Sequence, residues 1–269
     1  MRYRRLHDWN VTPQEAIRLQ ERLRGEVVLQ DGAPGSPRLV AAMDVSYDRG
    51  SPWIFAAIVV LRLPRLEVIE QAAVRCRARF PYVPGLLSFR ELPPGLTAWE
   101  RLRTRPDCLI CDGHGYAHPR RFGLACHFGL LVELPTIGCA KSVLVGEYRE
   151  PGARRGSMSD LVHEGEVIGA AVRTRQAVSP VFVSVGHRIS LPTAVRIVLA
   201  CSPRYRIPEP IRQAHALVNR LREVESNGGP KPDKAGESKH CTIFTTKWLA
   251  GHSRLDCSPG FCNGNVSSP

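Results

Sequence analysis

The sequence predicts an α/β fold in which a mixed sheet, a three-strand antiparallel meander followed by parallel βα units, is flanked by helices. Two observations predict it. Three apolar, strand-like runs separated only by short turns lie between residues 38 and 76, which is typical of antiparallel neighbours. From residue 107 the pattern changes to strand, loop, helix and strand, and this alternation is typical of parallel βα units.

The elements follow in order along the chain. A lead-in helix is expected at about 12–29, because Thr12 can cap it, Pro13 fits its first turn, and apolar residues follow at helical spacing. The predicted meander strands are 39–46, 54–63 and 66–74. After a proline-rich loop at 80–85 we expect two short helices, at 86–91 and 97–103. The remaining predicted elements are strands at 107–111, 136–140, 167–173 and 181–185, and helices at 122–132, 192–201 and 209–223.

This order of strands and helices matches the ribonuclease H-like architecture, which alone says little about activity. The predicted domain covers residues 1–225. Residues 226–269 contain sixteen Gly, Pro and Ser among forty-four and no sustained periodicity, so we expect a disordered or loosely attached tail.

The chain is strongly basic. Its formal net charge is +12, from 37 Lys and Arg against 25 Asp and Glu. Such an excess favours a polyanionic partner, although many basic proteins are merely soluble. No run of eighteen apolar residues occurs, and the first residues lack the apolar core of a signal peptide. We therefore expect a soluble, cytoplasmic protein without a membrane partner.

The nine cysteines predict neither a disulfide framework nor a metal site. Most lie inside apolar runs and are interpreted as small buried hydrophobic residues, namely Cys76, Cys108, Cys111, Cys139 and Cys201. On a strand, positions 108 and 111 face opposite sides, which disfavours zinc binding by this pair. The late Cys241, Cys257 and Cys262 do not form a convincing metal set.

Three acidic residues carry the chemical prediction. Asp44 and Asp112 each lie at the downstream end of an apolar strand-like run, where a carboxylate is costly unless a cation meets it. The carboxyl ends of strands in α/β sheets are also where ligands bind. With Glu91 they supply the oxygen donors that Mg²⁺ prefers, which favours a metal-dependent nuclease. Each acid alone is more simply a strand-end cap or a surface salt bridge.

Five ordered blocks resemble the endonuclease V family of deoxyinosine 3′ endonucleases, and they span about residues 38–224. The blocks are PYVPGLLSFRE at 81–91, DGHGYAHPRRFGLA at 112–125, GCAKS at 138–142, SVGHRISL at 184–191 and IPEPIRQAH at 207–215. The resemblance implies a nuclease that recognises inosine in DNA or RNA. It implies cleavage of the second phosphodiester bond on the 3′ side, which leaves a 3′-hydroxyl and a 5′-phosphate, in DNA repair or inosine-RNA processing.

The resemblance also assigns the catalytic residues. Asp44, Glu91 and Asp112 match the metal-binding acids of the family, with Mg²⁺ as the expected ion and Mn²⁺ as a substitute. His215 matches a position that would assist a second metal or the water, and its alternative is a helix-surface histidine. Lys141 follows an apolar run and is expected at the same sheet edge, where it would steady the scissile phosphate or form an ion pair with an acid.

Seven residues are expected to bind the substrate. Tyr82 matches a wedge pushed beside an extruded base, held in a stiff proline frame. Its alternative is a loop tyrosine packed on the core. Gly85 and Gly113 are expected to let the backbone approach the base. The others are Leu87 and Leu144, which would line the pocket or belong to the core, and His118 and Arg120, which would contact phosphate or bond within their loop.

Two other functions compete with an inosine-directed, monomeric endonuclease. One is a nucleic-acid binding module that keeps the fold and the basic face but does not cut, and the three acids argue against it. The other is a nuclease directed to a general structure or to RNA/DNA hybrids. The choice between DNA and RNA depends on contacts to the 2′-hydroxyl that the sequence does not reveal.

Overall fold

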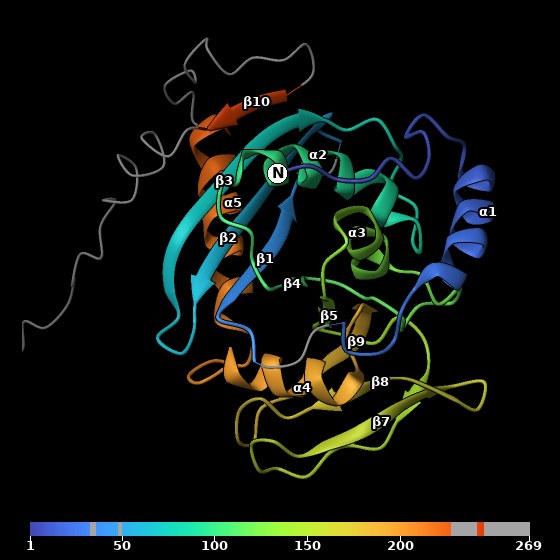
Figure 1. Ribbon diagram of the computed structural model, residues 1–269, viewed down its shortest axis with the longest axis vertical. Coiled ribbons are helices and arrows are strands. Elements are labelled where there is room, and N and C mark those ends of the chain that lie inside the picture. Colours follow the sequence, from blue (N-terminus) through green and yellow to red (C-terminus); the bar gives the residue numbers. More distant parts are fainter. Residues whose placement is uncertain (33–35, 48–49, 227–240, 245–269) are drawn as a thin grey trace, which may run out of the picture.

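One mixed sheet runs through the molecule (Figure 1). The computed structural model describes residues 1–32, 36–47, 50–226 and 241–244, and within these residues ten strands pair in the order β10-β3-β2-β1-β4-β5-β9-β8-β7-β6. The strands are β1 (Leu39–Ser46), β2 (Trp53–Arg62), β3 (Glu67–Arg77), β4 (Cys108–Cys111), β5 (Thr136–Ala140), β6 (Glu147–Tyr148), β7 (Met158–His163), β8 (Glu166–Val172), β9 (Val181–His187) and β10 (Cys241–Phe244). The helices are α1 (Pro13–Leu23), the 3-10 turn η1 (Arg24–Glu26), α2 (Leu87–Arg101), α3 (Leu124–Val132), α4 (Leu191–Ala200) and α5 (Glu209–Ser226).

The predicted topology of the central sheet is confirmed. β1, β2 and β3 form an antiparallel meander, and β4 and β5 then add in parallel next to β1. Parallel pairing ends there, because β9 is antiparallel to β5, and β8, β7 and β6 continue antiparallel. The three parallel strands β1, β4 and β5 therefore share one carboxyl edge in the middle of the sheet.

Helices cover both faces of the sheet. Along β1, Val40 and Ala42 belong to the core cluster formed with α4 and α5, whereas Ala41 and Met43 belong to the cluster formed with α2 and α3. This alternation follows from the two-residue period of a strand. Since both faces are buried, the strand reads as a continuous apolar run up to the acid that ends it.

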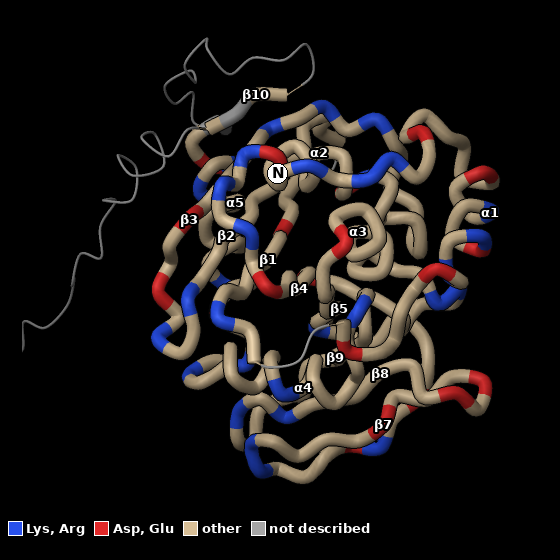
Figure 2. Tube along the Cα trace, in the orientation of Figure 1, with Lys and Arg blue, Asp and Glu red and all other residues tan. Residues whose placement is uncertain are grey.

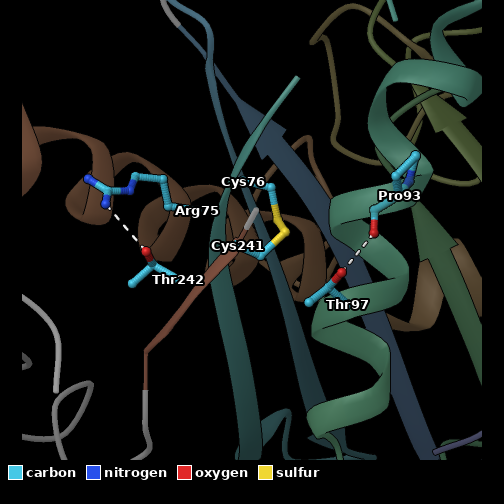
Figure 3. The surroundings of a disulfide bond; sticks show 6 residues. All are labelled: Arg75, Cys76, Pro93, Thr97, Cys241 and Thr242. Carbon is cyan, nitrogen blue, oxygen red and sulfur yellow. Dashed lines mark hydrogen bonds between the residues drawn. A yellow bond between two sulfur atoms is a disulfide. The ribbon is translucent and has the colours of Figure 1, made fainter. Parts of the chain in front are cut away.

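The prediction of two short helices at 86–91 and 97–103 is wrong, because α2 is continuous through Pro93 and Pro94. Two interior prolines remove two backbone donors and disfavour a helix. Packing compensates: Leu92 and Trp99 are buried against the sheet, and the Thr97 hydroxyl donates to the Pro93 carbonyl at 3.0 Å (Figure 3). Tertiary contacts thus outweigh the local preference.

Two elements differ from the sequence prediction for simpler reasons. The first helix ends at Leu23 and passes into η1, so residues 27–29 lie outside it. Strands β6 and β7 were not predicted. Both are partly exposed at the edge of the sheet, and their sequences lack the apolar alternation on which strand prediction depends.

Part of the predicted tail belongs to the sheet. β10 pairs antiparallel with β3, and Cys241 forms a disulfide with Cys76 (Figure 3). Cys76 is buried as predicted, but it is bonded to Cys241 and is not a free cysteine, whereas Cys108, Cys111, Cys139 and Cys201 are free and buried. The pairing was missed because the two cysteines lie 165 residues apart. The other tail residues, among them Cys257 and Cys262, lie outside the described residues.

Basic residues are distributed over the whole fold, and Figure 2 shows Lys and Arg on helices, strands and loops around the molecule. None of the described helices is long and apolar enough to cross a membrane.

Candidate active site

Two of the predicted acids meet at the carboxyl edge of the parallel strands. Met43 of β1 lies opposite Cys111 of β4 in parallel register, so Asp44 and Asp112 are the next residues on neighbouring strands. Asp44 is buried and Asp112 is partly buried. Burial raises the pKa of Asp44, and the neighbouring Asp112 carboxylate raises it further.

The third acid comes from α2. Burial raises the pKa of Glu91 to about 8, and the charges of Asp44 and Asp112 contribute in the same direction. The three carboxylates are therefore close enough to repel one another. Such a cluster stores unfavourable charge that a bound cation would relieve.

Two basic side chains face these acids. The Lys141 ammonium lies 2.5 Å from Asp112 Oδ2, and His215 Nδ1 lies 2.7 Å from Asp44 Oδ2. The backbone of Lys141 is itself held, because the Arg206 guanidinium donates to its carbonyl at 2.8 Å.

The proton of His215 is placed by its neighbours. The amide nitrogen of Asn219 lies 2.9 Å from His215 Nε2, and the Ser46 hydroxyl donates to the other end of the Asn219 side chain at 3.0 Å. Because the Asn219 oxygen accepts from Ser46, its nitrogen donates to Nε2. His215 therefore carries its proton on Nδ1 and donates it to Asp44.

The donor set fits a hard divalent cation, since it consists of carboxylate oxygens whose mutual repulsion raises the pKa values of Asp44 and Glu91. Among residues 1–32, 36–47, 50–226 and 241–244, however, no group of three or more His, Cys, Asp or Glu side chains is placed so that it could hold a metal ion as it stands. Lys141 and His215 each occupy an oxygen that an ion would compete for.

A pocket of about 220 Å³ opens beside the acids. Its lining residues are Gln20, Tyr82, Pro84, Gly85, Leu87, Ser88, Glu91, Asp112, Gly113, His114, His118, Gly123, Leu124 and Leu144. Asp44 does not line it, although its charge contributes to the raised pKa of Glu91, which does line it. The pocket is mostly apolar, with acids at one side, which suits a planar ligand attached to a phosphate chain.

The Gly85 carbonyl is the most heavily bonded group of the pocket wall. His118 Nε2 and Arg120 Nη2 both donate to it, each at 2.9 Å. His118 Nδ1 accepts from the Arg120 backbone at 3.2 Å, so both ring nitrogens are used. Burial and the adjacent Arg120 charge lower the pKa of His118 to about 4, which keeps the ring neutral. The side chains of His118 and Arg120 thus hold the separate loop that contains Gly85, and of these contacts only the bond from the Arg120 backbone to His118 lies within their own loop.

Gly85 itself requires the absence of a side chain. Its φ is +77°, and a Cβ would lie 3.1 Å from Arg120 Nη2. At Gly113, a Cβ would meet Leu124 only at an ordinary 3.4 Å. Both conformation and contacts thus favour glycine at 85. At 113 Leu124 leaves room for a Cβ, and it is the backbone conformation, with φ at +159°, that disfavours a side chain.

Tyr82 stands at the pocket mouth. Its side chain is exposed, with 59% of its surface accessible, and its ring centroid lies 6.3 Å from that of Tyr47. Tyr47 in turn lies under the Arg90 guanidinium, 4.8 Å from its ring centroid. Tyr82 is therefore not a core residue. Leu144 is also exposed, whereas Leu87 is partly buried.

The structure brings all twelve predicted site residues to one place. Eight of them line the pocket, and Asp44, Lys141, Arg120 and His215 join it through the contacts given above. Sequence reasoning missed Gln20, Ser46, Asn219 and Arg206. A signal existed for Gln20, which is polar on the buried face of α1 beside Ala16 and Leu23.

Acids at the shared carboxyl edge of parallel strands, beside a mostly apolar pocket in a strongly basic chain, are typical of a metal-dependent hydrolase of nucleic acids. Comparison with known proteins narrows the class. The family model for endonuclease V matches residues 21–216, and the chain belongs to the endonuclease V family. Family members are nucleases, and membership implies a divalent metal cofactor.

Individual relatives support membership in the endonuclease V family. The endonuclease V of Myxococcus xanthus is 52% identical over 217 residues, covering 81% of this chain and 92% of the relative. The crystal structure of the Streptomyces avermitilis enzyme is 46% identical and superposes with a TM-score of 0.78, covering 81% and 96% of the two chains. The ribonuclease H-like architecture is thereby confirmed.

A third match contains nucleic acid. Endonuclease V of Ciona intestinalis was crystallised in complex with a 24-nucleotide DNA containing an inosine followed by a ribo-adenosine. That protein is 30% identical, with a TM-score of 0.70 and coverage of 78% of this chain and 98% of its own.

Proposed function

We propose that this protein is an inosine-directed endonuclease that hydrolyses the second phosphodiester bond on the 3′ side of the inosine and leaves a 3′-hydroxyl and a 5′-phosphate, in DNA repair or inosine-RNA processing. One observation carries the proposal: the three carboxylates lie beside a pocket of about 220 Å³ whose mouth presents Tyr82. The inosine-containing DNA bound by the Ciona relative supports the choice of base.

Asp44, Glu91 and Asp112 would hold the metal, for which we propose Mg²⁺ with Mn²⁺ as a substitute. Carboxylate oxygens with water and phosphate completing the shell match the preference of both ions. When bound, such an ion makes a water nucleophilic at neutral pH and stabilises the leaving oxygen.

The protein groups around the acids have separate tasks. Lys141 places a positive charge where the scissile phosphate meets Asp112, which favours the negative charge that develops during hydrolysis. His215 donates to Asp44 and fixes the direction of its free oxygen. Lys141 thus contributes charge and His215 contributes the orientation of Asp44, and neither role requires the residue to transfer a proton.

The pocket wall would receive the extruded base. Tyr82 projects from a proline-framed loop and would fill the gap that the base leaves in the strand. Leu87, Leu144 and Gly113 would face the base, and the loop held by His118 and Arg120 would present main-chain groups to its edge. A hypoxanthine pairs poorly, so extracting it costs less than extracting a normal base.

The test uses matched DNA and RNA strands, each with a single inosine or none, incubated with Mg²⁺ or Mn²⁺. We expect a single nick at the second bond 3′ to the inosine, and loss of at least about a thousandfold in rate for Asp44→Ala, with binding largely retained. Equal cutting of unmodified strands, or an active Asp44→Ala protein, would refute the proposal. The cytoplasmic location, the monomeric state and the domain boundary at residue 225 stay predictions.

A further inference from the structure

A buried glutamine connects the two walls of the pocket. Gln20 lies on α1, is 1% exposed, and lines the pocket beside Gly85 and His118. It precedes the first residue of the family match at 21–216, and none of the sequence motifs includes it.

Every polar atom of the Gln20 side chain has a partner. Its amide nitrogen donates to the Gly85 carbonyl and to the Phe122 carbonyl, each at 3.0 Å, and its amide oxygen accepts from Arg120 Nε at 2.6 Å. The side-chain orientation is fixed by this arrangement, because a flipped amide would set its oxygen against two carbonyls. Gln20 therefore has no hydrogen-bonding group left for a base.

The contacts join parts of the pocket that are distant in sequence. Gly85 belongs to the loop that carries Tyr82, and Phe122 directly precedes Gly123 and Leu124, which also line the pocket. The Gly85 carbonyl receives three donors, from Gln20, His118 and Arg120, and Arg120 is bonded both to Gln20 and to His118. His118 and Arg120 belong to the same segment as Phe122 and join the two walls directly, while Gln20 fastens both walls to α1. The Gln20 side chain thereby helps to set how far apart the walls lie.

We propose that Gln20 is a positioning and specificity-determining residue, which fixes the width of the base pocket and thereby the preference for inosine. The inference rests on the proposed function of the site. A preorganised pocket binds a planar base without losing further conformational entropy. A loosened pocket must become ordered when it binds, which weakens the affinity. The effect should therefore fall on substrate affinity and base preference, and leave the chemical step at the acids unchanged.

The central variant is Gln20→Met, which keeps the side-chain length and volume but removes all three hydrogen bonds. We expect KM for an inosine strand to rise about tenfold and kcat to change by less than about threefold. Activity on an unmodified strand should fall by less than activity on the inosine strand, so the ratio of kcat/KM between the two strands should fall severalfold. The matched control is Gln14→Met on the exposed face of the same helix, which should leave every value unchanged.

A second variant separates the partners of Gln20. Gln20→Glu keeps an acceptor for Arg120 but directs a carboxylate at the carbonyls of Gly85 and Phe122. If the bridge between the walls matters, this variant should lose base preference at least as strongly as Gln20→Met. Full preference in Gln20→Glu would overturn the inference, because the contact to Arg120 would then suffice.

Amide hydrogen exchange gives a readout that needs no substrate. The amides of residues 85–87 should exchange faster in Gln20→Met and not in Gln14→Met. Unchanged exchange, an unchanged preference ratio, or a loss of kcat with constant KM would each overturn the inference. A wild-type protein that cuts both strands equally would instead refute the proposed function, and the exchange measurement would still decide whether Gln20 holds the walls.

Discussion

The pocket wall and the acid edge of the same site are built in opposite ways. In the wall, Gly85 accepts three hydrogen bonds and each polar atom of Gln20 is paired. At the acid edge, burial and mutual repulsion raise the pKa values of Asp44 and Glu91. The wall is complete without a ligand, whereas the edge gains stability when a cation arrives. The pocket wall is thus preorganised for a ligand, whereas the carboxylates reach their favourable charge state only with a bound cation.

Among the groups that surround the acids, the largest effect is expected from removing the positive charge of Lys141. Lys141→Met should lower kcat about a hundredfold, because the developing phosphate charge loses its nearest protein cation. The same change frees an oxygen of Asp112, so half-maximal activity should need less metal. Cleavage rates titrated with Mg²⁺ measure both effects.

Lys141→Arg is the control for this prediction, since it keeps the charge and should retain most of the activity. A Lys141→Met protein with wild-type kcat would show that the ion pair with Asp112 is only structural. The acid edge would then resemble the pocket wall, as a set of contacts that is complete without a ligand.

A smaller effect is expected from the hydrogen-bond chain behind Asp44. Asn219→Leu removes the donor that holds the His215 proton on Nδ1, so the imidazole can place it on Nε2 and turn away from Asp44. We expect kcat to fall about tenfold with KM nearly unchanged. The measurement is single-turnover cleavage across a pH series.

Glu223→Leu, at an exposed position of the same helix, serves as the comparison and should behave as wild type. If Asn219→Leu instead raised KM and spared kcat, the chain through Ser46 would belong to substrate binding and the assignment of His215 would be wrong.

The smallest expected effect is on stability, and it tests the burial and the mutual repulsion of the acids together. The folded pKa of Glu91 is about 8, above its ordinary value of 4.5. Between these values the folded state holds a proton that the unfolded state has lost, so metal-free stability must fall as pH rises from about 5 to 8. Asp44, whose pKa is also raised, adds a decline of the same sign.

Glu91→Gln cannot ionise and should lose much of this decline. We expect the melting temperature of metal-free wild-type protein to drop by about 5 °C across that interval and that of the variant to drop less. Added Mg²⁺ should flatten the wild-type curve. A wild-type melting temperature that rises with pH over this range would contradict the repulsion at the acid edge.

The sequence predicted those features that depend on neighbouring residues in the chain. The apolar run of β1 that leads to Asp44 indicates a strand and its carboxyl end, and the parallel neighbour β4 repeats this pattern before Asp112. Together they placed Asp44 and Asp112 at one edge without any knowledge of distances.

The parts that escaped prediction depend on contacts between distant residues. Two prolines signal a break, yet packing of Leu92 and Trp99 carries α2 through them. A glutamine on an apolar helix face signals only that some partner exists, and the partners of Gln20 lie 65 to 102 residues away. The pairing of Cys76 with Cys241 had no local signal at all.

Strand β10 has a consequence for how the protein behaves at high concentration. Without it, β3 would be a long outer strand with a free row of backbone donors and acceptors, which is a template for pairing with another copy. β10 occupies those groups, and the bond between Cys76 and Cys241 ties this cover covalently to the strand it protects. A strong reducing agent would break this disulfide, so that only hydrogen bonds would hold β10 on β3. Storage under such conditions should therefore favour self-association through β3.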